Sequence, residues 1–217
     1  MHLGFSICFL DVARWKKIKG LENFDTSKNR SFGDMFAFCT NLKELDLISF
    51  DSSYSTDFSY MFQACTNLQS LDLSNFNTEK AEHYTGMFSK CENIKSIYVS
   101  KSFENTSSAV SVSMFNECPN LVGGMGTIYD PAFIDATAAR IDGGSENPGY
   151  FTDIKDKPAE SVADQTASDE SAIDIPTAGD YIEDESQEQQ IETTAPAPAA
   201  TPSADNADDE EGTDINN

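Results

Sequence analysis

A twelve-residue segment recurs along the first part of the chain at a nearly constant spacing. It reads FAFCTNLKELDL from Phe36, FQACTNLQSLDL from Phe62 and FSKCENIKSIYV from Phe88, and a fourth copy starts as FNECPNL at Phe115. The Met-Phe pairs at these positions follow one another after 26, 26 and 27 residues. Self-similarity at a fixed period of this length is typical of a repeat architecture, in which each unit packs against its neighbours.

Within each repeat the spacing of the apolar residues changes from helical to extended. The first repeat places apolar residues at i, i+3, i+4 and i+7, as on one face of a two-turn helix: Phe32, Met35, Phe36 and Cys39. Apolar and polar residues then alternate at residues 45–47, 71–73 and 97–99, as in a half-buried strand. One short helix and one short strand are therefore predicted in each repeat.

An asparagine follows the cysteine of each repeat by two residues. Asparagine tolerates the left-handed conformation that ends a helix, so helix caps are predicted at these positions: Asn41, Asn67, Asn93 and Asn120. Because a two-turn helix and a four-residue strand are each unstable alone in water, the repeats must stack. The predicted fold class is α/β: a short leucine-rich-repeat-type solenoid of about four coils of 26 residues, followed by a disordered acidic tail.

The composition changes sharply near residue 152. Residues 1–152 hold 18 Asp and Glu against 12 Lys and Arg, whereas residues 153–217 hold 19 against 2. If the eight bulky apolar side chains of residues 153–217 were fully buried, they would contribute roughly 12 to 24 kcal/mol. Ordering the backbone of those residues costs on the order of 65 to 130 kcal/mol. The predicted domains are an N-terminal cap (1–20), the repeats (21–121), a C-terminal cap (122–152) and a disordered acidic tail (153–217).

The net charge of −23 makes some partners improbable on physical grounds. A surface this negative repels phosphates, so neither a nucleic acid nor an anionic membrane is expected as a partner. No apolar segment approaches the length of a membrane span, and the run 5–10 is too short for a secretory signal. Direct membrane insertion is therefore not expected.

Several of these motifs together resemble a known family. The units MFQACTNLQSLDLSNFNTEK and MFAFCTNLKELDLISFDSS, the opening KIKGLENFDTS, and the closing GGMGTIYD and AARIDGGSENPGYFT look like the BspA-like leucine-rich-repeat surface proteins of host-associated bacteria. The resemblance covers about residues 16–152. It implies a secreted or surface-attached protein that binds host matrix proteins or other cells, with no catalytic residues. We expect the chain to be a fragment of such a protein, and a cytoplasmic location if it is complete.

The cysteines and His83, residue types that often bind metals or act in catalysis, are expected to have structural roles in this chain. Cys39, Cys65, Cys91 and Cys118 stand one per repeat without the pairs that structural zinc sites use, so we expect free, buried thiols and no metal. His83 is expected to be a solvated edge residue. No cofactor and no catalytic site are predicted.

The outward face of the predicted strands carries a mixed polar strip. We predict partner binding there, with a merely solvated face as the alternative: Lys43, Glu44, Asp46, Gln69, Asp72, Lys95 and Tyr98. Asp46 and Asp72 would lie side by side on adjacent strands, and a cationic group on a ligand could relieve their repulsion. The predicted function is non-catalytic protein-protein interaction or adhesion at the cell surface. An intracellular scaffold or a structural spacer is the alternative.

Overall fold

The computed structural model describes residues 16–103, 110–159 and 172–174, and nothing is described of the side chains of 172–174. Every described residue belongs to one compact unit within residues 1–181. Most of the predicted tail therefore lies outside the described residues, as do residues 1–15 of the predicted N-terminal cap. The described elements are β1 (Lys17–Lys19), η3 (Leu21–Asn23), β2 (Ser70–Leu73), β3 (Ser96–Val99), η4 (Ala136–Ala138), η5 (Gly144–Glu146), β4 (Phe151–Asp153), η6 (Ile154–Asp156) and β5 (Ala172–Asp174).

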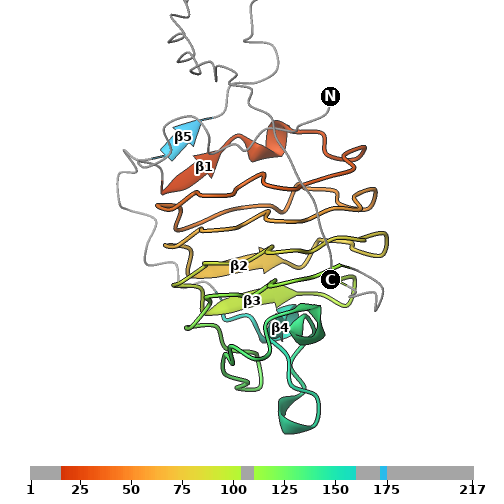
Figure 1. Ribbon diagram of the computed structural model, residues 1–217. Helices are drawn as coiled ribbons and strands as arrows, with labels where there is room; N and C mark the ends of the chain where they lie inside the picture. The colour runs from red at the N-terminus through yellow and green to blue at the C-terminus, as the bar shows by residue number, and fades with distance from the viewer. Residues whose placement is uncertain (1–15, 104–109, 160–171, 175–217) are drawn as a thin grey trace, which may run out of the picture. The chain divides into compact units, whose positions relative to one another are not determined.

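The strands form two small parallel sheets (Figure 1). In the larger sheet β3 lies between β2 and β4, and Asp72 of β2 pairs with Tyr98 of β3, one repeat further along the chain. The strand β4 spans the end of the predicted C-terminal cap and the first residue of the predicted tail, Asp153, and it pairs Thr152 with Tyr98. In the smaller sheet β1 pairs with β5. Strands one repeat apart thus align their alternating side chains in register, which was predicted for residues 71–73 and 97–99.

The predicted fold class, an α/β leucine-rich-repeat-type solenoid, is wrong. The described residues contain no α-helix, and their helices are 3-10 helices of three residues each. Where helices were predicted, the chain forms tight turns at residues 32–39, 58–65, 84–91 and 111–118, which we call the turn segments. The strand predicted at residues 45–47 is also absent, although Glu44 makes an isolated bridge with Lys17.

The backbone hydrogen bonds explain why the turn segments are not helical. In the first turn segment the N–H groups of Met35 and Cys39 donate to carbonyls three residues back, at 3.2 Å each. The N–H groups of the alternate residues donate instead to the next repeat, such as Phe36 to the carbonyl of Met61 at 2.9 Å. An α-helix would use every interior N–H within the segment. Sharing them between repeats satisfies the same donors and joins neighbouring repeats (Figure 1).

Residues in the left-handed region recur with the same period. One set stands immediately before the methionine of each Met-Phe pair: Asp34, Tyr60, Gly86 and Ser113. The other set stands three residues after that methionine: Phe38, Ala64, Lys90 and Glu117. A left-handed residue every fourth position interrupts the right-handed helical path. In the first turn segment the side chains of Phe32, Met35, Phe36 and Cys39 are still buried, which is why the sequence shows a helical spacing.

Three of the four asparagines that were predicted to cap helices instead connect neighbouring repeats. The side-chain amides of Asn67, Asn93 and Asn120 donate to carbonyl oxygens of the preceding repeat at 2.8, 2.7 and 2.7 Å. None of the four asparagines lies in the left-handed region. Their recurrence therefore reflects a bond between repeats, and the helix-cap interpretation is wrong.

The core consists of aromatic side chains stacked from repeat to repeat. The rings of Phe36, Phe62, Phe88 and Phe115 follow one another at centroid distances of 5.7, 5.6 and 5.5 Å, and all four side chains are fully buried. A second row begins with Phe32, Phe58 and Tyr84. Offset stacking at these distances stabilises the core beyond the burial of apolar area.

The cysteines lie beside the aromatic rows. Cys65, Cys91 and Cys118 are free and buried, and each thiol donates to a carbonyl of the preceding repeat, at 3.2, 3.1 and 3.0 Å. The interpretation as free core thiols is therefore confirmed for these three. Cys39 is disulfide-bonded, so a free thiol there was a wrong prediction. Its partner is not among the described residues.

Candidate partner-binding face

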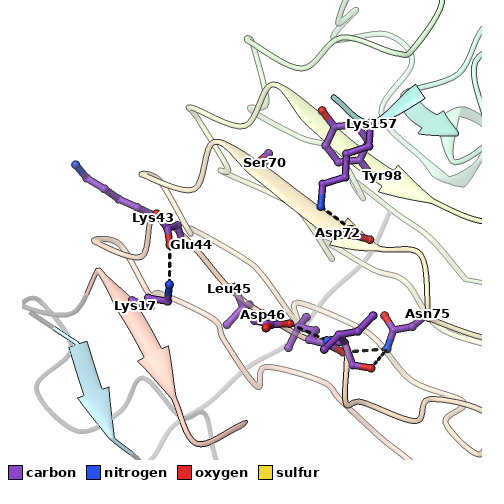
Figure 2. A pocket seen from close by; sticks show the side chains of 12 residues that line it. Lys17, Lys43, Glu44, Leu45, Asp46, Ser70, Asp72, Asn75, Tyr98 and Lys157 are labelled. Atoms are coloured by element: carbon purple, nitrogen blue, oxygen red, sulfur yellow. Dashed lines mark hydrogen bonds and ion pairs between the residues drawn. The ribbon is translucent and has the colours of Figure 1, made fainter. Parts of the chain in front are cut away.

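A pocket of about 520 Å³ lies over the strip predicted from the sequence (Figure 2). Five of the seven predicted residues line the pocket: Lys43, Glu44, Asp46, Asp72 and Tyr98. The side chains of Gln69 and Lys95 do not line it, although both are exposed. Sequence reasoning thus found much of one face, and the structure limits the site to part of it.

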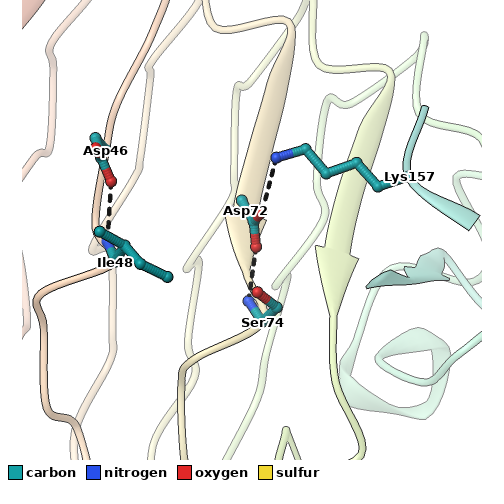
Figure 3. A network of polar contacts seen from close by, with 5 residues as sticks. All are labelled: Asp46, Ile48, Asp72, Ser74 and Lys157. Carbon is teal, nitrogen blue, oxygen red and sulfur yellow. Dashed lines mark hydrogen bonds and ion pairs between the residues drawn. The ribbon is translucent and has the colours of Figure 1, made fainter. Parts of the chain in front are cut away.

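The strand register places the acidic and aromatic residues of the pocket next to each other. Asp72 and Tyr98 occupy paired positions on β2 and β3, and the alternation along each strand turns both side chains away from the buried neighbours Leu71 and Ile97. The Asp46 carboxylate accepts a hydrogen bond from the N–H of Ile48 at 3.0 Å (Figure 3). This bond fixes the Asp46 carboxylate at the pocket wall.

Lys157 reaches Asp72 from outside the repeats. Its ammonium nitrogen lies 2.8 Å from the Asp72 Oδ2, and it lies 5.7 Å from the centre of the Tyr98 ring (Figures 2 and 3). Lys157 directly follows η6 in the chain. Its backbone N–H donates to the carbonyl of Ile154, the first residue of η6, at 3.2 Å. The expected repulsion between Asp46 and Asp72 is therefore moderated by a cation of the chain itself.

These contacts change the acidity of Asp72. Burial by itself raises the pKa of the carboxyl group, but the hydrogen bonds from Lys157 and Ser74 outweigh burial and lower its pKa below the ordinary value. The Ser74 N–H donates to Asp72 Oδ1 at 2.9 Å (Figure 3). Asp72 is therefore a carboxylate at neutral pH, ready to accept from a cationic donor.

The opposite end of the pocket holds a second ion pair. The Lys17 ammonium of β1 lies 3.0 Å from Glu44 Oε2, and the two side chains are 43% and 67% exposed (Figure 2). An ion pair this exposed adds little to stability. Its consequence for the pocket is that Lys17 and Glu44 neutralise each other, while Asp46 and Asp72 are the other carboxylates of the lining and Asp72 is the one paired in register with Tyr98.

Apolar side chains and one amide complete the pocket. Leu45 is half-buried and Ile48 is 71% exposed, so the pocket offers apolar surface beside its charges. The Asn75 amide donates to the carbonyls of Leu47 and Phe50 at 2.9 and 2.8 Å, which holds the turn that presents Ile48. Aromatic side chains are enriched in surfaces that bind proteins, and polar groups surround them at the solvent-accessible rim.

A family model described as "Mycoplasma protein of unknown function" matches residues 5–125, more than half of the 217-residue chain. The chain belongs to the DUF285 family. Comparison with curated proteins finds no match, and comparison with solved structures finds none either.

In this DUF285 protein the family match contains most of the pocket and excludes Lys157. Sequence reasoning missed Lys157 because it belongs to no repeat and lies 85 residues from Asp72. It also missed Lys17, Ile48 and Asn75. The strip was predicted from residues 43–46, 69–72 and 95–98, and these three residues lie outside those ranges.

The described part of this DUF285 protein shows no arrangement of three or more His, Cys, Asp or Glu side chains suited to hold a metal ion. None of the helices described here has the length and apolar character that a membrane crossing requires. His83, the histidine considered for acid-base chemistry, is exposed and takes part in parallel bridges with Asp57 and Val110.

Proposed function

We propose that this protein is a non-catalytic protein-protein interaction module that binds its partner at the pocket face. The observation that carries the proposal is the convergence of Asp46, Asp72 and Tyr98 on one pocket of about 520 Å³, beside exposed apolar surface. The pocket residues combine carboxylates that can accept hydrogen bonds with an aromatic ring that can contact apolar or cationic groups.

The class of partner rests on the sequence resemblance to the BspA-like surface proteins. That resemblance favours display at the cell surface or outside the cell, and a partner among host matrix proteins or proteins of other cells. The net charge of −23 supports a partner with a basic surface, because opposite charges raise the rate of encounter.

The test uses the full chain and a panel of purified extracellular-matrix proteins immobilised on a biosensor. The variant Asp46→Lys/Tyr98→Ala removes an acidic group and an aromatic ring from the pocket. The control Glu82→Lys/Tyr54→Ala makes the same changes at exposed residues that do not line the pocket. We expect the pocket variant to lose at least about tenfold in affinity, which corresponds to about 1.4 kcal/mol.

Two outcomes would contradict the proposal. One is that the unmodified chain binds none of the matrix proteins. The other is that pocket and control variants bind equally well. Thermal unfolding of both variants, with melting temperatures close to that of the unmodified chain, ensures that the comparison reports binding.

A further inference from the structure

Lys157 contacts the pocket in the way that a cationic side chain of a bound partner would contact it. Its ammonium group pairs with the Asp72 carboxylate at 2.8 Å and lies near the face of Tyr98. A carboxylate and an aromatic ring together are a common receptor for lysine and arginine, because one supplies charge-assisted hydrogen bonds and the other a cation–π contact. One end of the pocket is thus already filled by a cation from this chain (Figure 2).

The ion pair is accessible to a competitor. The side chains of Lys157 and Asp72 are 30% and 32% exposed, so water reaches both. Ion pairs with this degree of exposure stabilise a structure only weakly. The residues after Lys157, Pro158 and Ala159, are exposed as well. The ion pair between Lys157 and Asp72 is therefore open to competition from a cationic side chain of another protein.

The charge of the pocket favours such a replacement. Glu44 is paired with Lys17, so without Lys157 the Asp72 carboxylate lies beside Tyr98 with no cation of the pocket paired to it, and Asp46 adds a second carboxylate to the pocket lining. Two carboxylates lining one pocket attract a cation more strongly than one does.

We propose that the Asp72 and Tyr98 end of the pocket receives a lysine or arginine side chain of a protein partner, and that Lys157 is an intramolecular competitor displaced on binding. This inference rests on the proposed function and adds the chemistry of the ligand and a self-inhibitory contact. Asp72 supplies the anionic acceptor, Tyr98 supplies the ring, and Asp46 supplies additional negative charge.

The test is an NMR titration of the full chain with the capped peptide acetyl-Gly-Ser-Lys-Ser-Gly-amide, observed at the Tyr98 ring. Lys157→Gln removes the competitor, and Lys155→Gln is the control, since Lys155 is exposed and pairs with Asp153 outside the pocket. We expect Lys157→Gln to bind the peptide about two- to fivefold more tightly than Lys155→Gln. Adding Asp72→Asn to Lys157→Gln should abolish the binding, and a peptide with Gln in place of Lys should not bind.

Equal affinity of the two lysine variants would overturn the inference, because the gain would then come from net charge. Weaker binding by Lys157→Gln would also overturn it, because Lys157 would then contact the ligand itself. These failures are distinguishable from failure of the proposed function. If the lysine peptide does not bind but Asp46→Lys/Tyr98→Ala still weakens matrix-protein binding, the pocket face is functional and only the cationic ligand is wrong.

Discussion

The rings of Phe62 and Phe88 lie face to face, with centroids 5.6 Å apart and planes inclined by 5°, although they are 26 residues apart in the chain. The same contact joins Phe36 to Phe62 and Phe88 to Phe115. The row therefore ties four repeats together through side chains that no single repeat could bury alone.

Truncating a ring in the middle of this row should be costly. Phe62→Ala is expected to lower the free energy of unfolding by about 3 to 5 kcal/mol, because it removes buried apolar area and leaves a cavity. Phe38→Ala removes the same group from a side chain that is 61% exposed, and should change stability by less than about 0.5 kcal/mol. Urea denaturation followed by circular dichroism measures both. Equal losses would contradict a core built on the aromatic row.

Gly86 and Tyr60 are coupled across adjacent turn segments. Gly86 has φ of +59°, and a Cβ at this position would lie 2.6 Å from Cδ1 and Cε1 of Tyr60. Gly86→Ala should therefore cost about 1 to 2 kcal/mol for the left-handed backbone and an additional amount for the clash. In a Tyr60→Ala background only the backbone part should remain. A double-mutant cycle by urea denaturation measures the difference, and purely additive losses would mean that no clash occurs.

The cysteines should differ in the conditions under which they react with an alkylating reagent. Burial raises the pKa of the Cys65 and Cys118 thiols to about 12, and it raises that of Cys91 well above the ordinary value. Iodoacetamide at pH 8 is expected to leave these three unmodified in the native protein and to modify them after unfolding in urea. Cys39 should react only when a reductant is added, because it is disulfide-bonded. Peptide mapping by mass spectrometry checks this, and modification of Cys39 without a reductant would contradict the disulfide.

Asp142 should make stability depend on acidic pH. Its carboxylate accepts four hydrogen bonds, from the N–H groups of Met125, Thr127 and Gly144 and from the Thr127 hydroxyl. Burial alone would raise its pKa, but these hydrogen bonds outweigh burial and lower the pKa below the ordinary value. Because the pKa is lower in the folded state, the stabilisation is present above the unfolded value of about 3.9 and is lost as the pH falls through the folded pKa.

The corresponding experiment compares Asp142→Asn with the unmodified chain. The asparagine amide places an N–H donor against backbone N–H donors. We therefore expect the free energy of unfolding to fall by about 2 to 4 kcal/mol at pH 6, and by less at pH 3, where the carboxylate of the unmodified chain contributes less to stability. Glu146→Gln, at an exposed residue nearby, should change stability little at either pH. Urea denaturation at the two pH values gives the answer, and a loss for Asp142→Asn that does not shrink at pH 3 would argue against this role.

The spacing of residues along the chain predicted the inward positions of the first repeat, Phe32, Met35, Phe36 and Cys39, and the distance between equivalent residues of successive repeats. The period of 26 residues predicted that the strands of successive repeats lie side by side, and the alternation within residues 71–73 and 97–99 placed Asp72 and Tyr98 on an outward face. These features follow from local spacing, because a strand turns successive side chains to opposite sides whatever it packs against.

The partners of the backbone hydrogen bonds and the contacts between distant groups depend on the folded structure. The spacing of Phe32, Met35, Phe36 and Cys39 fits a helix and a series of tight turns equally well, since both bury the same side chains. The chain forms turns because a neighbouring repeat supplies carbonyl acceptors for alternate N–H groups. The spacing of residues within one repeat does not show that a neighbour lies there. The contact of Lys157 with Asp72 depends in the same way on folding, because no periodicity relates two residues 85 positions apart.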